Sequence, residues 1–468
     1  MAYKVTIGLE IHAELKTNTK MFCQCKNDPD EEKPNWNICP VCTAQPGTLP
    51  VINKKAVEHV LRVGTALGSN LADFTEWDRK NYFYPDIPKN YQISQYKYPL
   101  VSGGTLAGVD ITRIHLEEDT GSSQHDQGDY SLVNYNRAGV PLMELVTEPV
   151  IHDAETAMRF AKELQLLLRY LGASDANMEK GEMRVEANIS ISETETFGTK
   201  VEVKNINSFK SVGDAIAYEI KRHAEVLGRG EKIVQETRGW DENASKTFSQ
   251  RKKESANDYR YFPDPDLPKM QISEIPEFQN LKGTLPELPW EKRERLQKEY
   301  DFPDFITEML VTNEIVRDFF EKVASGLSGD KELIKLASNY LTSDLAALMK
   351  AGDGTPWKVT PENFIGLMHM VHAGDVSSRG AKDTLAILYK EGGDANVVAE
   401  KNGLIQKSDA GALEAIVKEV ITANQGVADE YKAGKLASLQ YLVGQGMKAS
   451  KGSANPQVLS ELFKKSLE

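Results

Sequence analysis

The first regular element of the chain is the stretch Val5-Thr6-Ile7-Gly8-Leu9-Glu10-Ile11-His12-Ala13-Glu14-Leu15. Its odd positions are apolar, and its even positions from Glu10 onward are ionisable. This strict alternation predicts a half-buried β-strand. Glu10 and His12 then lie on one face, roughly 6.6 Å apart, because a strand rises about 3.3 Å per residue. The spacing suits ligands of one metal ion or of neighbouring ions, and a solvated strand face is the alternative.

A second stretch, Ile114-His115-Leu116-Glu117-Glu118-Asp119, ends an apolar run with three adjacent carboxylates. These groups repel one another unless positive charge lies between them, and Mg²⁺ is the natural counter-charge because it prefers oxygen ligands. By alternation Glu118 lies with Ile114 and Leu116, while Glu117 lies with His115. A twist at the strand end leaves open which carboxylate faces the site.

Other strands and helices follow the same kinds of pattern. Glu144 lies in a short apolar strand, and residues 183–189 and 200–204 alternate, with polar faces of Arg184, Glu186 and Asn188 and of Lys200, Glu202 and Lys204. Helices are predicted from Asp153 to Gly172 and from Ser208 or Ser211. We expect the acidic and histidine side chains of these strands to form the walls of one site.

The length and composition are those of a soluble globular protein. At 468 residues the chain exceeds one ordinary core, and about three domains are expected. Hydrophobic residues make up 40% and charged residues 27%. No apolar run approaches the roughly 20 residues that span a bilayer, and the first residues lead into a strand pattern instead of a signal peptide. We therefore expect a cytoplasmic protein.

The net charge of −13 argues against a generic nucleic-acid coat, which would be basic. The charge is uneven, because residues 401–468 hold nine Lys against two Asp and five Glu, a balance of +2. The preceding 400 residues therefore carry −15. The last segment could bind a polyanion, and a helical domain with a solvated lysine face explains its charge equally well.

The pattern of elements predicts an α+β protein. Residues 1–290 mix antiparallel strands with a few helices, and the proline-rich stretch from Pro263 to Pro289 marks their end. Short helices without β-rich runs are predicted for 291–402, and a small all-helical tail for 403–468. We thus predict a β-rich cradle domain, an all-α middle domain and an all-α tail domain.

All four cysteines lie within twenty residues, as Cys23, Cys25, Cys39 and Cys42. Disulfides are improbable without a secretory signal, and two closely spaced pairs fit a tetrahedral zinc ion held by four thiolates. Such an ion would be structural and would fasten a loop. Because the first pair is CxC instead of CxxC, reduced thiols without metal are the alternative.

Residues 78–86 are dense in cations and aromatic rings, including Arg79, Lys80 and Tyr82, and residues 91–96 continue this composition. Rings stack on bases while Arg and Lys bind phosphates, so the segment suits a nucleotide or an RNA end. An irregular loop anchored by buried tyrosines is the alternative. The chain lacks the GxxxxGK[ST], GxGxxG and HExxH motifs. Its carboxylates, histidine and cations match metal-assisted phosphoryl transfer, and suit a metal-dependent hydrolase or nuclease equally well.

At seven segments the sequence resembles the B subunit of the bacterial aspartyl/glutamyl-tRNA amidotransferase. They run in one order over nearly the whole chain: Gly8 to His12, Asp78 to Asp86, His115 to Asp119, Asn136 to Pro141, Lys204 to Ser208, Asp258 to Pro263 and Met447 to Gly452. The resemblance implies a kinase-like site in the β-rich cradle and a tail that binds tRNA. It also implies a ligase of protein biosynthesis that uses ATP to phosphorylate the side-chain carboxylate of Glu-tRNA(Gln) or Asp-tRNA(Asn), which ammonia then converts to the amide. The ammonia would come from a separate amidase (A) subunit, joined by a small linker (C) subunit in a heterotrimer.

The resemblance also assigns residues to the site. It implies one Mg²⁺ held by His12, Glu118 and Glu144, and a second held by Glu10, Glu118, Glu186 and Glu202, with Glu10, His12, Glu118 and Glu144 catalytic. Glu118 would have to leave the apolar face at the strand end. ATP and the aminoacyl end are expected near Arg79, Lys80, Tyr82 and Lys204, from charge. The competing hypotheses are a zinc-bearing RNA-binding subunit without catalysis and a stand-alone Mg²⁺ nuclease.

Overall fold

The computed structural model describes residues 3–124, 128–252, 259–352, 356–406, 410–450 and 454–467. The chain divides into two compact units, Met1–Pro289 and Trp290–Glu468. Asp258, Lys451 and Gly452, which belong to two of the segments quoted above, lie outside the described residues. Each unit has its own elements and is described by itself.

A ten-stranded sheet forms the centre of the first unit. Its order is β15-β14-β13-β12-β1-β11-β8-β6-β2, and β7 also pairs with β8. The pairs are antiparallel except for β13 and β14, which are parallel. The strands are β1 (Lys4–Glu14), β2 (Asn70–Leu71), β6 (Val101–Ser102), β7 (Thr105–Leu106), β8 (Val109–Glu118), β11 (Pro141–Thr147), β12 (Met183–Ser192), β13 (Val201–Ile206), β14 (Glu236–Asp241) and β15 (Lys246–Lys252).

Short strands and helices surround this sheet. The small sheets are made of β16 (Phe262–Pro263), β4 (Asp78–Asn81) and β5 (Tyr91–Ser94); of β9 (Ser122–Gln124) and β10 (Leu132–Asn134); and of β3 (Phe74–Thr75) and β17 (Met270–Gln271). The helices are α1 (Lys54–Ala66), α2 (Ala154–Tyr170), α3 (Phe209–Gly228) and the 3₁₀ turns η2 (Ile272–Glu274), η3 (Pro276–Phe278) and η4 (Lys282–Thr284).

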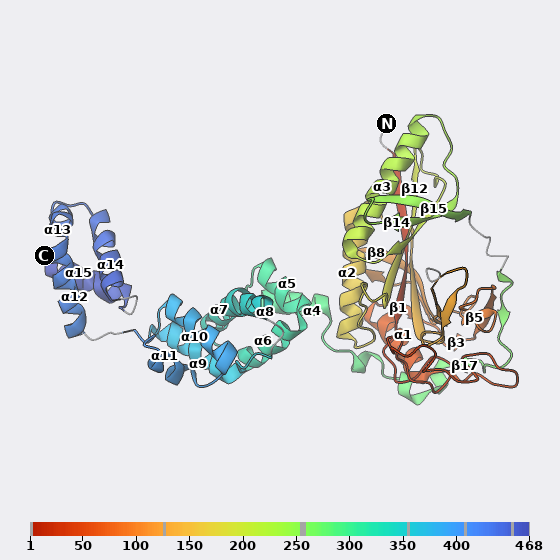
Figure 1. Cartoon of the computed structure of the whole chain (residues 1–468), viewed down its shortest axis with the longest axis horizontal. Coiled ribbons are helices and arrows are strands. Elements are labelled where there is room, and N and C mark those ends of the chain that lie inside the picture. The colour runs from red at the N-terminus through yellow and green to blue at the C-terminus, as the bar shows by residue number, and fades with distance from the viewer. Residues whose placement is uncertain are drawn as a thin grey trace. The chain divides into compact units, whose positions relative to one another are not determined.

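The strand β1 lies in the middle of the large sheet, between β11 and β12. Its odd residues Ile7, Leu9 and Ile11 are at most 1% exposed, as the alternation predicts. The helices α2 and α3 pack against one another along one side of the sheet (Figure 1). The opposite face carries Glu10 and His12 and is the polar one.

Capping residues fix where these two helices begin. The Asp153 carboxylate accepts from the Thr156 N–H, and the Ser208 hydroxyl accepts from the Ser211 N–H. Such caps satisfy backbone N–H groups that have no partner within the helix. The helices predicted from Asp153 and from the Ser208 region are therefore confirmed.

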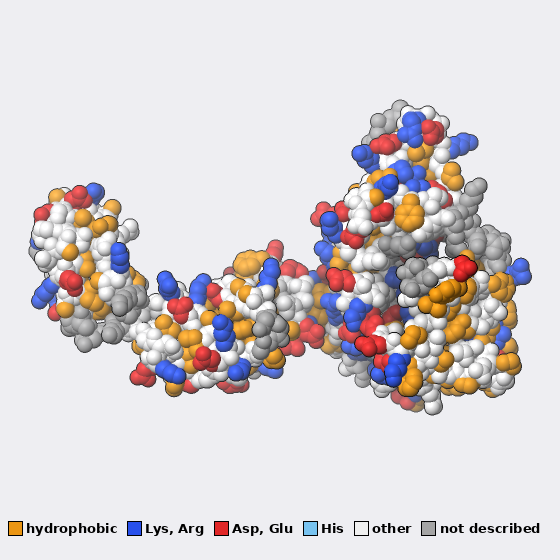
Figure 2. Space-filling view, viewed as in Figure 1, with side chains coloured by type: hydrophobic (Ala, Val, Ile, Leu, Met, Phe, Trp, Pro, Cys, Tyr) orange, Lys and Arg blue, Asp and Glu red, His pale blue; other side chains and the backbone are white. Residues whose placement is uncertain are grey.

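The second unit consists of helices in its described part. They are α4 (Pro289–Tyr300), which begins at the boundary, then α5 (Asp304–Thr312), α6 (Glu314–Gly326), α7 (Lys331–Tyr340), the π-helix η5 (Leu341–Leu345), α8 (Ala346–Ala351), α9 (Pro361–Ala373), α10 (Ser378–Glu391), α11 (Ala395–Lys401), α12 (Ala410–Ala423), α13 (Gln425–Lys432), α14 (Ala437–Ala449) and α15 (Pro456–Leu467). The last four enclose an apolar cluster that includes Val417, Leu442 and Phe463, each 0% exposed. Figure 2 shows Lys and Arg side chains interspersed with Asp and Glu over this unit in that view.

The predicted fold class is confirmed in its main features, a mostly antiparallel sheet followed by a helical part. The division of the helical part into a middle and a tail domain stays a prediction. In the described residues no helix is both long and apolar enough to cross a bilayer.

Candidate active site

Three neighbouring strands bring two histidines and two glutamates together on the polar face of the sheet. Residue pairing places His12 of β1 opposite Glu144 of β11, and Glu144 opposite His115 of β8. His12 Nε2 and His115 Nε2 each lie 3.4 Å from Glu144 Oε2. Glu117 lies between the two histidines. Its Oε1 is 3.8 Å from His12 Nε2, and its Oε2 is 3.8 Å from His115 Nε2. We call Glu10, His12, His115, Glu117 and Glu144 the acidic basin.

Glu118 lies outside this basin. The strand β8 stays in register with β11 as far as Glu118, which pairs with Pro141. Because alternation continues to this residue, the Glu118 side chain leaves the sheet on the face opposite Glu117. There it accepts hydrogen bonds from Lys89 Nζ at 2.7 Å and from the Ile93 N–H at 3.0 Å. The structure thus places Glu117, and not Glu118, among the residues expected to bind Mg²⁺.

A second group of carboxylates adjoins the first. Glu10, Glu186 and Glu202 have one oxygen each within 4.8 Å of the others. Lys204 Nζ lies 2.8 Å from Glu186 and 4.0 Å from Glu202, which also accepts from Thr237 Oγ1 at 2.8 Å. Glu10 therefore belongs to both groups, and the predicted convergence of Glu10, Glu186, Glu202 and Lys204 agrees with this geometry.

Burial and mutual repulsion perturb the charges in the basin. Burial, with the nearby charges of Glu144 and Glu186, raises the pKa of Glu10 to about 7. Burial would lower the pKa of both histidines, but the neighbouring carboxylates overcome it and raise the pKa of His12 and of His115 to about 9. The two imidazolium groups hold the pKa of Glu144 well below its usual range against the effect of burial. A strongly coupled set of acids and bases of this kind is typical of a functional site.

Lys80 of β4 lies over the basin within an aromatic wall. Its Nζ is 5.1 Å from the ring centroid of Tyr259 and 5.7 Å from that of Tyr82. Burial alone would lower the pKa of Lys80, but the charges of Glu117 and Glu144 raise it. The raised pKa keeps Lys80 cationic at physiological pH.

The Arg79 side chain points away from the acidic basin, and its contacts have a structural role. Its guanidinium donates to Asp264 at 2.7 Å and Asp266 at 3.1 Å and lies 4.3 Å from the Tyr91 ring centroid. The cavity described below is not lined by Arg79 or Tyr82 in the described residues. The contacts of Arg79 thus fasten β4 to the segment after β16.

The basin opens into a cavity of about 310 Å³ between the polar face of the sheet and the β4–β5 sheet. Sequence reasoning assigned no individual site role to Arg113, Tyr259 and Tyr261, which line this cavity. It placed His115 and Glu117 in the acidic stretch without choosing between Glu117 and Glu118, and Tyr96 in the aromatic segment expected to suit a nucleotide. The alternation of β8 predicts that His115 and Glu117 lie on the same face, so this pattern could have identified both residues. No local pattern pointed to Tyr259 and Tyr261, because they come close only in the fold.

The donor set of the basin fits a hard divalent cation. Its ligand atoms are carboxylate oxygens and imidazole nitrogens, and each of the groups Glu10–His12–Glu144, His115–Glu117–Glu144 and Glu10–Glu186–Glu202 lies within 4.8 Å. Glu117 Oε2 is buried and accepts no hydrogen bond from the residues that the structure describes. A buried carboxylate oxygen without a donor is costly unless a cation neutralises it.

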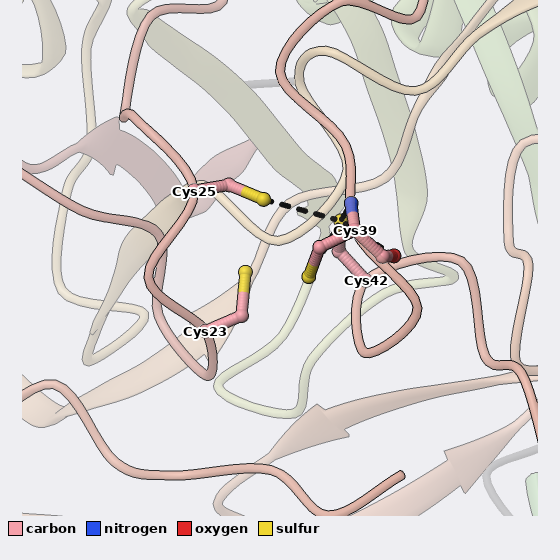
Figure 3. A group of neighbouring side chains, drawn as sticks. All are labelled: Cys23, Cys25, Cys39 and Cys42. Atoms are coloured by element: carbon pink, nitrogen blue, oxygen red, sulfur yellow. Dashed lines mark hydrogen bonds between the residues drawn. The ribbon is translucent and has the colours of Figure 1, made fainter.

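The four cysteines form a separate cluster on the loops after β1. Their sulfur atoms lie within 4.8 Å of one another, with 3.8 Å between Cys39 and Cys42 and 4.0 Å between Cys25 and Cys42. Figure 3 shows the four side chains pointing toward a common centre. Sulfur ligands of tetrahedral zinc are about 3.8 Å apart, because a Zn–S bond is about 2.3 Å. The geometry therefore fits the predicted zinc ion.

A buried lysine supports the charge of this cluster. Lys20 is 0% exposed, and its Nζ lies 4.0 Å from Cys42 Sγ and donates to the Tyr135 carbonyl at 3.0 Å. A hydrogen bond from Cys23 and the charge of Lys20 lower the pKa of the Cys42 thiol to about 5. The lowered pKa favours the thiolate form of Cys42, which is the form that binds metal.

Two family models together match most of the chain. Residues 5–276 match the GatB/GatE catalytic domain, and residues 318–467 match the GatB domain. The first match covers the strands of the sheet from Val5 onward and every residue of the acidic basin.

Several full-length relatives are named as the B subunit of an aspartyl/glutamyl-tRNA(Asn/Gln) amidotransferase. The chain is 44% identical over 481 residues to that of Caldanaerobacter subterraneus subsp. tengcongensis, with 100% of each chain covered. It is 42% identical over 482 residues to that of Persephonella marina, again with 100% of each covered, and 41% identical over 482 residues to that of Carboxydothermus hydrogenoformans, with 99% of each covered.

Proposed function

Because the chain belongs to the family of aspartyl/glutamyl-tRNA(Asn/Gln) amidotransferase B subunits, we propose that its acidic basin carries out the ATP-dependent step of tRNA-dependent amidation. The resemblance drawn from the sequence is thereby confirmed at the level of the family. The convergence of two histidines and several carboxylates beside Lys80 and Lys204 is the observation that supports the proposal.

The proposed reaction has two steps. A side-chain carboxylate oxygen of the misacylated aminoacyl-tRNA attacks the γ-phosphorus of ATP, and ADP leaves with the bridging oxygen. Ammonia then attacks the acyl carbon, and inorganic phosphate leaves with the carboxylate oxygen that made the attack. Such reactions depend mainly on positioning the reactants and on stabilising charge, which suits a site rich in fixed charges.

Two ions of Mg²⁺ would be held by the acidic basin and the adjoining carboxylates. His12, Glu117 and Glu144 are assigned to one ion because the two carboxylates lie 3.8 Å and 3.4 Å from His12 Nε2. Glu10, Glu186 and Glu202 are assigned to the other, and Glu117 replaces Glu118 in the set that the resemblance implies. When bound, Mg²⁺ would neutralise negative charge on the phosphates of ATP. The ligand carboxylates and His12 must be deprotonated to bind it.

The cations beside the carboxylates, Lys80 and Lys204, would contact the phosphoryl group during its transfer. Lys80 is held between two tyrosine rings, and Lys204 is held by Glu186, so both charges are preorganised. Preorganised charge in a buried site stabilises a transition state without reorganisation at the moment of reaction. Arg79 has a positioning role in this proposal, through the anchoring of the strand that carries Lys80.

A structural Zn²⁺ would be held by Cys23, Cys25, Cys39 and Cys42. The sulfur spacing and the buried Lys20 support this assignment. The ion would close the loops after β1 and would take no part in the reaction. The remaining partners in this proposal are an amidase (A) subunit that supplies ammonia, a small (C) subunit, and the misacylated tRNA.

The proposal is tested with the chain assembled with amidase and small subunits. Glu-tRNA(Gln) and Asp-tRNA(Asn) are supplied in turn, with ATP and with ammonium chloride in place of glutamine, and formation of the amidated aminoacyl-tRNA is followed. We expect wild type to be active and Glu144→Gln to lose at least about 100-fold in rate, as for loss of one preorganised charge. Glu148→Gln is the matched control, since Glu148 follows the same strand but bonds Thr112 outside the basin.

Retained tRNA binding with no ATP-dependent product from wild type would contradict the proposal. That outcome would favour an RNA-binding subunit whose carboxylates serve structure alone.

A further inference from the structure

A pair of stacked tyrosines stands at the cavity beside the acidic basin. The rings of Tyr96 and Tyr261 are nearly parallel, with an interplanar angle of 11° and 4.2 Å between centroids. Both residues line the cavity, and Tyr96 is 56% exposed. One ring face of Tyr96 therefore packs on Tyr261, while much of the rest of the ring is open to a ligand.

Buried polar residues hold Tyr96 in place. The Asp78 carboxylate, 3% exposed, accepts from the N–H of Tyr96 at 2.9 Å and of Lys97 at 3.2 Å. The preceding residue, Gln95, is 1% exposed; it donates to Thr75 Oγ1 at 2.6 Å and accepts from the Leu116 N–H at 3.0 Å. An exposed aromatic ring on a backbone fixed in this way loses little conformational entropy when a ligand stacks on it.

Tyr261 is supported from the other side by the aromatic wall. Its ring makes an edge contact with Tyr259 at 6.0 Å, and Tyr259 makes another with Tyr82 at 6.0 Å. Lys80 lies over Tyr259, so the wall leads from the exposed ring of Tyr96 toward the basin. The stacked tyrosines and Lys80, the lysine proposed to bind phosphate, therefore line the same cavity.

A third cation lines this cavity and has no assigned role. Arg113 of β8 has a side chain 37% exposed, and its Nη2 lies 3.6 Å from Glu144 Oε1. With Lys80 and Lys204, it gives the cavity a cation from each of three strands. An exposed ring stack beside several cations matches a nucleotide, whose base stacks while its phosphates meet positive charge.

We propose that Tyr96 and Tyr261 form a stacking platform for an adenine base and that Arg113 contacts a phosphate of the same adenosine nucleotide. This inference rests on the proposed function, in which ATP and the 3′-terminal adenosine of the tRNA both approach the basin. The two sources share one chemistry, an adenine ring with a phosphate attached through ribose. Stacking on a tyrosine pair recognises that chemistry without reading base edges.

The test measures KM for each adenosine-bearing substrate in the assembled complex, with ammonium chloride as nitrogen donor. Tyr96→Ala should raise KM for one substrate about 5- to 150-fold, the range expected for loss of one stacked base, and change kcat much less. Tyr96→Phe keeps the ring and should restore the wild-type KM. Tyr130→Ala is the matched control, because Tyr130 is also 56% exposed and does not line the cavity.

The two arms identify the source of the adenine. A rise in KM for ATP at saturating aminoacyl-tRNA assigns the platform to the free nucleotide, and a rise in KM for aminoacyl-tRNA at saturating ATP assigns it to the terminal adenosine. Arg113→Gln should raise KM for the same substrate as Tyr96→Ala. If Tyr96→Ala had wild-type KM values for both substrates, the proposal that adenine stacks on this tyrosine pair would be wrong.

A binding measurement separates this inference from the proposed function. Calorimetric titration of the same complexes with ATP, and with an RNA hairpin ending in an unpaired adenosine, needs no turnover. If wild type gave no ATP-dependent product, the proposed function would fail, and the titrations would still decide the platform. Weaker binding of either probe by Tyr96→Ala but not by Tyr130→Ala supports the stacking platform. If Tyr96→Ala binds both probes as tightly as wild type does, the platform is contradicted.

Discussion

Two adjacent glutamates lie on opposite faces of β8 and have different partners. Glu117 lies between His12 and His115, whereas Glu118 is neutralised by Lys89 and a backbone N–H. We expect Glu117→Gln to raise the Mg²⁺ concentration for half-maximal amidation by about tenfold or more, because it removes a ligand charge. Glu118→Gln is the matched control and should leave that concentration near the wild-type value. The reverse result would restore Glu118 as the ligand.

Glu219 of α3 is a buried carboxylate whose ionisation stabilises the first unit. It is 0% exposed, accepts hydrogen bonds from Arg222 and Thr247, and lies 3.1 Å from His223 Nε2. Burial alone would raise its pKa, but these partners lower it to about 2. Since the pKa in the unfolded chain is about 4.3, the stabilisation is complete above that value and is lost as pH falls toward 2.

Acid unfolding of Glu219→Gln tests this linkage. The variant should be less stable at pH 7 by roughly 2–4 kcal/mol, and the difference from wild type should shrink between about pH 4.5 and 2. Chemical denaturation of the first unit at several pH values measures it. Glu225→Gln on the exposed side of the same helix is the control. A pH-independent difference would show that Glu219 acts through packing instead of charge.

At the scale of residues, alternation predicted which side chains share a face but could not predict where alternation ends. Glu10, His12, Glu186 and Glu202 lie on one face as expected. Glu118 differs because β8 remains paired through its last residue instead of twisting before it. A local sequence pattern does not contain that information, since the pairing partner at Pro141 is distant in the chain.

At the scale of elements, a clamp of asparagines joins the loop between the two cysteine pairs to the segment before β11. Asn136 is 0% exposed; its amide donates to the carbonyls of Glu31 and Lys33 and accepts from the Asn37 N–H. We expect Asn136→Ala to destabilise the first unit by roughly 2–4 kcal/mol, because several buried groups lose their partners. Chemical denaturation checks this, with the exposed Asn280→Ala as control. Equal stability of the two variants would contradict the clamp.

The same loop carries the cysteine cluster, so metal content is a second prediction at this scale. We expect one zinc ion per chain by elemental analysis, its loss in Cys39→Ser, and a lower unfolding temperature for that variant. Lys20→Met should weaken zinc binding, because it removes the charge beside Cys42. A zinc-free wild type whose four thiols all react under native conditions would contradict the assignment.

Elements with strong local signals were predictable, and those created by pairing were not. The long alternating strands and the capped helices α2 and α3 agree with expectation. Two-residue strands such as β2 and β6, and the parallel pair β13–β14, depend on neighbours far away in sequence. The aromatic wall belongs to this second class, because Tyr259 and Tyr261 are distant from Tyr82 in the chain and join it only through the fold.

At the scale of the whole molecule, the change in sequence texture near residue 290 matches the boundary between units at Pro289. Apolar alternation ends there, and helical periodicity replaces it, so the division follows from local patterning. The acidic basin and the cysteine cluster both belong to the first unit. We therefore expect this unit to activate a carboxylate by phosphorylation.

Oxygen-18 in the side-chain carboxylate of Glu-tRNA(Gln) reports whether that carboxylate is phosphorylated. The assembled complex is given this substrate with unlabelled ATP and ammonium chloride, and the inorganic phosphate is analysed by mass; Asp-tRNA(Asn) is used likewise. We predict one labelled oxygen per phosphate released with wild type, and neither phosphate nor amide from Glu144→Gln. Amide formed with unlabelled phosphate would contradict phosphorylation of the carboxylate, and labelled phosphate from Glu144→Gln at the wild-type rate would place the step outside the acidic basin.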